Sequence, residues 1–190
     1  GIQTADIQEI LIRSANDLIS LDNPNYQFVA ARLLLFGLKK AVYNGDHPDK
    51  NPVLLEHVKR CVERGVYDGS IIEKYSEEEW DELNRFIDHA RDFNFTYAGM
   101  RQVTDKYLVQ DRSTGEIFET PQYMYIMIAA TLFQNDDKFY RLDYVRKYYN
   151  AISKQRINIP TPIMAGVRTP IRQFASCVLV DIDDTLDSIF

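Results

Sequence analysis

The sequence has few cysteines, no long apolar run and no excess of positive charge. Its two cysteines, Cys61 and Cys177, are too few for a disulfide framework and lack the spacing of a metal site. No apolar stretch approaches the roughly 20 residues of a membrane-spanning helix, and residues 1–10 show no signal-peptide pattern. These absences favour a reducing, cytoplasmic location and argue against a secreted or membrane-spanning class.

Positive charge is in the minority, with 22 Lys and Arg against 28 Asp and Glu and a net charge of −6. Nucleic acids and anionic membranes are bound through clustered Lys and Arg, so neither is an expected partner. The 45% hydrophobic content is enough for a sizeable core.

The histidines His47, His57 and His89 have no metal-ligand spacing, so they are predicted at the surface and no metal site is expected.

Most of the chain shows the apolar periodicity of helices. Helices are expected over residues 6–19, 23–43, 52–64, 76–87, 120–133 and 137–154. Thr4 or Asp6 can cap the first helix, and Ser76 with Glu79 forms a capping box for the fourth. Thr120 and the following proline mark the start of the fifth. The first three-quarters of the chain are therefore predicted to be mainly helical.

Two stretches depart from the helical pattern. Residues 106–120, KYLVQDRSTGEIFET, predict a small β-hairpin around a loop that contains Gly115. After residue 159 the character changes, because Pro160 and Pro162 disfavour helix locally. Residues 176–182, SCVLVDI, form the short apolar run of a strand buried on both faces. A further domain boundary is expected near residue 45, in the polar loop YNGDHPDKN.

The C-terminal stretch PTPIMAGVRTPIRQFASCVLVDIDDTLDSI, residues 160–189, resembles the first barrel segment of the large, catalytic subunit of class I ribonucleotide reductases. The upstream stretch FIDHARDFNFTYAGMRQVTDKYLVQDRSTGEIFETPQYMYIMIAATLF, residues 86–133, resembles the N-terminal helical domain of the same family. The resemblance covers essentially all 190 residues. It implies an N-terminal piece of a larger subunit, either excised or encoded as one part of a split subunit.

The resemblance implies a mainly α fold in three parts. Residues 1–45 resemble the later helices of a truncated ATP-cone, and residues 46–159 resemble the helical domain with its hairpin. Residues 160–190 resemble the start of the ten-stranded α/β barrel, including its first strand. The rest of the barrel, the radical-carrying cysteine and the C-terminal redox cysteines would lie beyond Phe190.

Cys177 is the candidate catalytic residue. In the family, this cysteine is one half of the dithiol that reduces the ribose 2′ position and becomes a disulfide. Such a thiol must reach the sugar and a second thiol, with a Cα–Cα distance of about 6 Å. The alternative is an ordinary buried cysteine, which is the expected role of Cys61.

The resemblance assigns Thr161 and Ser176 to the substrate diphosphate and sugar, although turn chemistry beside proline is the alternative explanation. It assigns Asp184, Thr185 and Leu186 to a site for a deoxynucleoside triphosphate that selects the base to be reduced. The alternative for these three is an acidic helix start, where aspartates interact favourably with the helix dipole.

Thr4 and Lys40 match positions that contact ATP or dATP in a complete cone. A helix cap and a solvated helix end are the simpler interpretations. No tightly bound cofactor is expected in this chain. Nucleotide effectors (ATP, dATP and other dNTPs, with Mg²⁺) belong to the complete enzyme, and the radical cofactor belongs to a partner subunit.

The leading functional prediction is part of a ribonucleoside-diphosphate reductase large subunit, an allosteric oxidoreductase that makes deoxyribonucleotides and is inactive as this chain alone. Its expected partners are the remainder of the large subunit, a second large subunit, the small radical-generating subunit, thioredoxin or glutaredoxin, and a ribonucleoside diphosphate. The alternative is a non-catalytic regulatory or assembly half that completes the barrel of a split subunit. Without the resemblance, the sequence predicts only an acidic, mainly helical domain.

Overall fold

The computed structural model describes residues 1–43 and 50–189, and helices dominate both ranges. The elements are α1 (Thr4–Asp17), α2 (Tyr26–Tyr43), α3 (Leu54–Glu63), the 3-10 helix η1 (Gly69–Lys74), α4 (Glu77–Phe86), the 3-10 helix η2 (His89–Asn94), α5 (Tyr97–Gln102), the π-helical turn η3 (Val103–Tyr107), α6 (Pro121–Phe133), α7 (Arg141–Ser153), α8 (Thr161–Gly166) and α9 (Leu186–Ile189). None of the helices in the described ranges is both long and apolar enough to cross a membrane.

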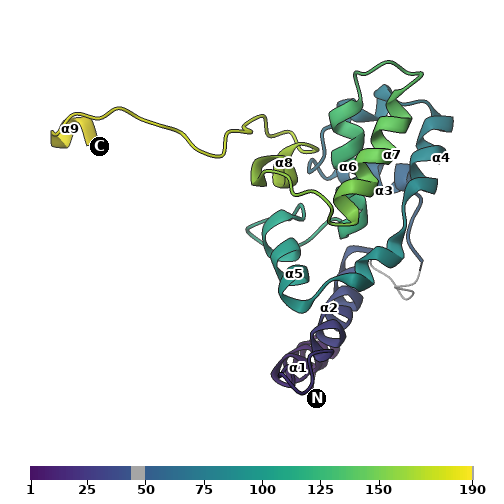
Figure 1. Ribbon diagram of the computed structural model, residues 1–190, viewed down its shortest axis with the longest axis vertical. Helices are drawn as coiled ribbons and strands as arrows, with labels where there is room; N and C mark the ends of the chain where they lie inside the picture. Colours follow the sequence, from purple (N-terminus) through teal and green to yellow (C-terminus); the bar gives the residue numbers. More distant parts are fainter. Residues whose placement is uncertain (44–49, 190) are drawn as a thin grey trace.

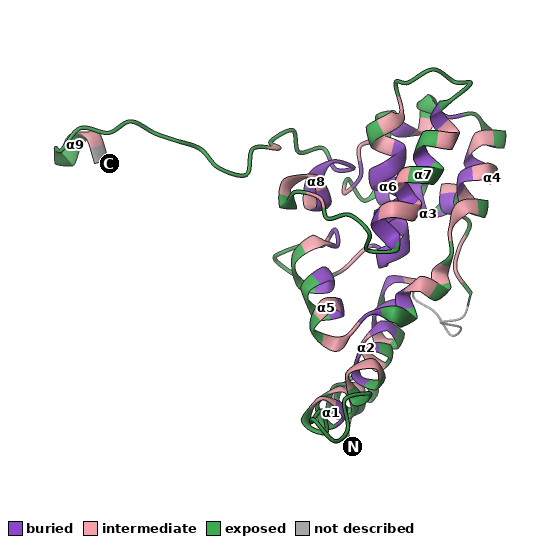
Figure 2. Cartoon of the chain, in the orientation of Figure 1, coloured by how far each residue is buried: buried purple, intermediate pink, exposed green. Residues whose placement is uncertain are grey.

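Helix α6 is the centre of the molecule. Residues 121–130 are all buried, so the helix is apolar on every side and is enclosed by its neighbours. Helices α3, α4 and α7 gather around it, and α8 lies at its flank (Figure 1). Helices α1 and α2 form a pair at one end, where α1 is mostly exposed (Figure 2). The chain after α8 runs away from this body to α9.

Several local predictions are confirmed. Ser76 caps α4 by accepting a bond from the Glu79 N–H at 3.3 Å, and the Glu79 carboxylate accepts from the Ser76 N–H at 2.8 Å. Thr120 is the N-cap of α6, with Pro121 in the first turn. Gly65 adopts a φ of +70° just after α3, a left-handed conformation in which a Cβ would be strained. Each of these features depends on groups within one turn of the chain.

The first helix differs from its prediction. Gln3, and not Thr4 or Asp6, is its N-cap, and Asp6 instead accepts a bond from the Gln3 N–H at 3.3 Å. Only Ala15 of its apolar face is buried, and Ile10 remains 54% exposed. Helix α2 therefore covers only a narrow part of the apolar face of α1.

The predicted hairpin is reduced to one antiparallel bridge between Gln110 and Ile117. The Phe118 N–H donates to the Val109 carbonyl at 3.0 Å beside this bridge, so the chain does reverse where expected. Gly115 supplies the turn with a φ of +76°. The prediction of two strands is wrong for the described residues. Next to the bridge, the Val109 N–H donates to the Glu119 side chain and not to a backbone carbonyl of the opposite arm, so the ladder is not continued.

The segment after residue 159 gives two corrections. Residues 161–166 form α8, although Pro160 and Pro162 were expected to prevent a helix. A proline in the first turn costs little, because the N–H that it lacks has no partner inside the helix. Residues 176–182 are exposed and form no strand, since no neighbouring strand in the described ranges accepts their backbone bonds. The predicted domain boundary near residue 45 lies outside the described residues. So do His47 and Phe190.

Candidate functional site

The structure does not bring the predicted site residues together. Thr161 is the first residue of α8, whereas Ser176 and Cys177 lie on the extended segment that leaves the helical body. Asp184 and Thr185 directly precede α9, at the far end of that segment (Figure 1). These five side chains are exposed, as are Leu186, Thr4 and Lys40. In this arrangement they do not form a common substrate or effector site.

The two cysteines differ sharply in environment. Cys177 is exposed, whereas Cys61 is buried on α3, where its Sγ donates to the Phe118 carbonyl at 3.7 Å. Burial and the nearby Glu119 carboxylate raise the pKa of the Cys61 thiol to about 12. The predicted core role of Cys61 is confirmed, and Cys177 is the accessible thiol of the pair.

Alkylation at pH 8 is therefore expected to label Cys177 at least about a hundredfold faster than Cys61, because the thiolate is the reactive form and burial suppresses it. Mass spectrometry of peptides after timed maleimide treatment measures both rates. In denaturant the two rates should converge. Equal rates in the native protein would contradict the burial of Cys61.

A buried ion pair anchors the start of the C-terminal segment. The Arg168 guanidinium donates to the Glu119 carboxylate, with Nε to Oε2 at 2.8 Å, and neither side chain is exposed. The same guanidinium donates to the Met164 carbonyl at 2.6 Å and to the Tyr107 carbonyl at 3.0 Å. The Tyr67 hydroxyl also donates to Glu119. We call Arg168, Glu119 and Tyr67 the Arg168 cluster.

The Arg168 cluster joins segments that are distant in sequence. Glu119 also accepts a bond from the Val109 N–H at 2.7 Å, and the Asp68 N–H donates to the Arg168 carbonyl at 3.0 Å. Burial disfavours the charge of Arg168, but the carboxylate beside it raises the guanidinium pKa above its ordinary value. The cluster therefore holds a full ion pair in the core and fixes α8 against η3.

Thr161 lies beside Tyr107 as a result. The pKa of the Tyr107 phenol is lowered, mainly because of a hydrogen bond with the Thr161 side chain. Sequence reasoning identified Thr161 but missed the Arg168 cluster that positions its helix. The available signal was a single arginine within the otherwise uncharged stretch PTPIMAGVRTP, since a charge in such a stretch needs a buried partner.

A second buried polar cluster surrounds Asp92 of η2. Gln122 of α6 donates to Asp92 Oδ1 at 2.7 Å, and the Tyr149 hydroxyl donates to Gln122 Oε1 at 2.7 Å. Asp92 Oδ2 has no partner among the described residues. Burial outweighs the bond from Gln122 and the charge of Lys39, and it raises the pKa of Asp92 to about 7. This carboxyl is therefore close to its titration point near neutral pH.

His57 lies in the core, so its predicted surface position is wrong. It is 1% exposed and stacks on Tyr123 with ring centroids 4.3 Å apart. Burial, reinforced by the Arg60 charge, lowers the pKa of His57 to about 3, so it is neutral at physiological pH. The signal was present, because position 57 shares a helix face with the apolar Leu54 and Cys61. His89 is partly buried, and burial lowers its pKa to about 4.

The described residues contain no group of three or more His, Cys, Asp or Glu side chains that could hold a metal ion. The chemically distinctive features are thus an accessible thiol on an extended segment, a hydroxyl-bearing helix start, and the ion pair that fixes this helix to the body.

This arrangement can be compared with known proteins. The family described as "Ribonucleotide reductase, all-alpha domain" matches residues 93–172. The match spans the stretch from η2 through α8 and includes both partners of the Arg168–Glu119 pair. The helical body therefore contains the all-alpha domain of ribonucleotide reductases.

Whole-chain similarity is more specific. The chain is 52% identical over 189 residues to the ribonucleoside-diphosphate reductase subunit alpha of Haemophilus influenzae, and it covers 25% of that protein. It is also 52% identical to the ribonucleoside-diphosphate reductase 1 subunit alpha of Escherichia coli and 47% identical to the alpha subunit of Enterobacteria phage T4, covering 24% of each. Over its whole length the chain is thus similar to ribonucleotide reductase large subunits, and it spans about a quarter of the length of these relatives.

Proposed function

We propose that this chain forms the helical domain and the first substrate-binding segment of a ribonucleoside-diphosphate reductase large subunit. The observation that carries the proposal is the 52% identity over 189 residues to alpha subunits named for this activity. The enzyme would reduce ribonucleoside diphosphates to 2′-deoxyribonucleotides. The catalytic centre would be completed by the remaining polypeptide of the subunit.

Cys177 would supply one of two thiols for this reaction. Two thiols are oxidised to a disulfide, the ribose C2′–O bond is replaced by a C–H bond, and the oxygen leaves as water. A thiol on an extended, exposed segment is suited to meet a second cysteine from another part of the subunit. Thioredoxin or glutaredoxin would restore the dithiol, and a small partner subunit would supply the radical that starts the reaction.

The neighbouring residues would bind nucleotides. The hydroxyls of Thr161 and Ser176 would contact the substrate diphosphate and sugar. Asp184, Thr185 and Leu186 would form one side of an allosteric site for a deoxynucleoside triphosphate near a dimer interface. Their exposure in the described structure is consistent with contact to further polypeptide.

Residues 1–45 would be the later part of an ATP-cone, with Thr4 and Lys40 facing ATP or dATP with Mg²⁺. Both side chains are exposed and available for such contacts. A cytoplasmic location follows for an enzyme that depends on reduced thiols.

A second candidate is an assembly role in a split large subunit. The apolar residues of 178–182 are exposed, and Leu179 is 99% exposed. An extended apolar segment with free backbone groups can add to the edge of a sheet in another polypeptide. This candidate predicts a stable complex with the barrel polypeptide but no requirement for Cys177 in turnover.

A chimera with the Escherichia coli relative tests the proposed function. The segment of that alpha subunit that aligns with this chain is replaced by this chain, and reduction of CDP is measured with the small subunit and thioredoxin. Turnover is expected, and Cys177→Ser should abolish it, because one dithiol sulfur is lost. Cys61→Ala is the matched control and should retain turnover. Turnover that survives Cys177→Ser would overturn the catalytic role and favour the assembly role.

A further inference from the structure

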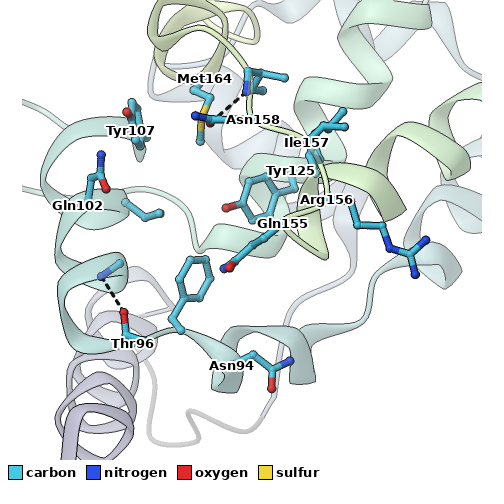
Figure 3. A pocket seen from close by; sticks show the side chains of 15 residues that line it. Asn94, Thr96, Gln102, Tyr107, Tyr125, Gln155, Arg156, Ile157, Asn158 and Met164 are labelled. Atoms are coloured by element: carbon cyan, nitrogen blue, oxygen red, sulfur yellow. Dashed lines mark hydrogen bonds between the residues drawn. The ribbon is translucent and has the colours of Figure 1, made fainter. Parts of the chain in front are cut away.

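A cavity of about 530 Å³ lies between α5, η3, α6, α8 and the loop after α7. Its size falls within the range of small-molecule sites. None of its lining residues is acidic, and Arg156 is the single charged residue among them. Figure 3 shows that the Arg156 guanidinium points away from the open centre. The interior is therefore polar but uncharged.

The Tyr125 hydroxyl faces this cavity (Figure 3). Tyr125 is only 5% exposed, and its hydroxyl has no hydrogen-bond partner among the residues that the structure describes. The hydroxyl opens onto the cavity, where solvent or a bound molecule can complete its hydrogen bonding. It is therefore available as a contact for a ligand.

Gln155 provides an independent observation. It has a φ of +56°, the left-handed conformation in which a side chain is strained and glycine is preferred. It follows α7, and its N–H donates to the Ile152 carbonyl at 2.9 Å. Glycine would make this turn at lower cost. The amide side chain of Gln155 instead points toward the open centre, near Tyr125 (Figure 3).

The lining groups define the chemistry of a ligand. Gln155 and Asn158 present amides, which can both donate and accept, and Tyr125 presents a hydroxyl. Phe95 and Met164 supply an aromatic ring and a thioether among the same walls. Amide side chains pair with the edges of nucleobases, and aromatic rings stack on their faces. A phosphate or a carboxylate would find no cation inside.

We propose that this cavity is a binding site for a nucleobase-bearing ligand, which it recognises through the uncharged base and not through a phosphate. Tyr125 and Gln155 contact the base edge. Ser176, Cys177 and Asp184 do not line the cavity, so the site is separate from the segment that carries them. It does not depend on the proposed reductase activity.

Calorimetric titration of the full chain with adenosine, guanosine, cytidine and uridine tests the site, with ribose 5-phosphate as the base-free control. At least one nucleoside is expected to bind with a Kd below about 1 mM, and ribose 5-phosphate is not. Tyr125→Phe should weaken binding by about 3- to 10-fold, which is the usual effect of one hydrogen bond. Tyr144→Phe, on the 42% exposed Tyr144 of α7, is the matched control and should have no effect.

Gln155→Gly separates recognition from folding. This variant removes the amide and relieves the left-handed strain, so it should unfold at a higher denaturant concentration while binding the nucleoside less tightly. The proposal is overturned if the chain is folded by circular dichroism and yet binds no nucleoside. Ribose 5-phosphate binding as tight as that of the nucleosides, or equal weakening by Tyr125→Phe and Tyr144→Phe, also overturns it.

Discussion

Replacing Arg168 with methionine is expected to lower the free energy of unfolding by about 3–5 kcal/mol, the usual cost of breaking a buried ion pair on one side. Methionine keeps most of the volume but leaves the Glu119 carboxylate in the core without its counter-charge. The carbonyls of Met164 and Tyr107 also lose their donor. Urea denaturation followed by circular dichroism measures the change.

The exposed pair between Arg172 and Asp68 provides the control. The Arg172 side chain is 61% exposed, so Arg172→Met is expected to cost at most about 1 kcal/mol. The double variant Arg168→Met with Glu119→Leu removes both buried charges and should recover a large part of the loss. Similar losses for Arg168→Met and Arg172→Met would show that the buried pair has no special contribution.

Replacing Asp92 with asparagine is expected to reduce the loss of stability between pH 4 and pH 8. The unchanged chain should lose stability over this range, and Asp92→Asn should lose less. Burial keeps the native carboxyl protonated up to a pKa of about 7, whereas an unfolded aspartate loses its proton near pH 3.9. Between these values the native state binds more protons, so stability falls as pH rises. The difference in pKa corresponds to about 4 kcal/mol, which is an upper limit because the environment relaxes.

Burial affects the pKa of Asp92 more strongly than the polar and charged groups that face it. Lys39 of α2 favours the charged form, Asp88 opposes it, and Gln122 donates to it, yet burial outweighs their sum. Urea denaturation of both proteins at a series of pH values gives the two stability curves. Asp22→Asn alters an exposed aspartate in the α1–α2 turn and should leave the curve unchanged. Parallel curves for the unchanged chain and Asp92→Asn would contradict a raised pKa.

Local sequence rules predicted much of the helical body. The Ser76–Glu79 capping box and the Thr120–Pro121 helix start both occur where expected, since each depends on groups within one helical turn. The same rules were misleading for Pro162, which is tolerated at the start of α8. They also failed for residues 176–182, because a strand needs a neighbour that local sequence does not provide.

The sequence alone determined where most helices begin and end, and its stretches 86–133 and 160–189 were sufficient to indicate the family. Only the tertiary structure decided which charges are buried and what they contact. Arg168 meets Glu119 across 49 residues, and Asp92 meets Gln122 across 30. The protonation of Asp92 and His57 and the open face of Tyr125 depend on burial. Burial results from the packing of distant segments and cannot be read from a residue and its neighbours in sequence.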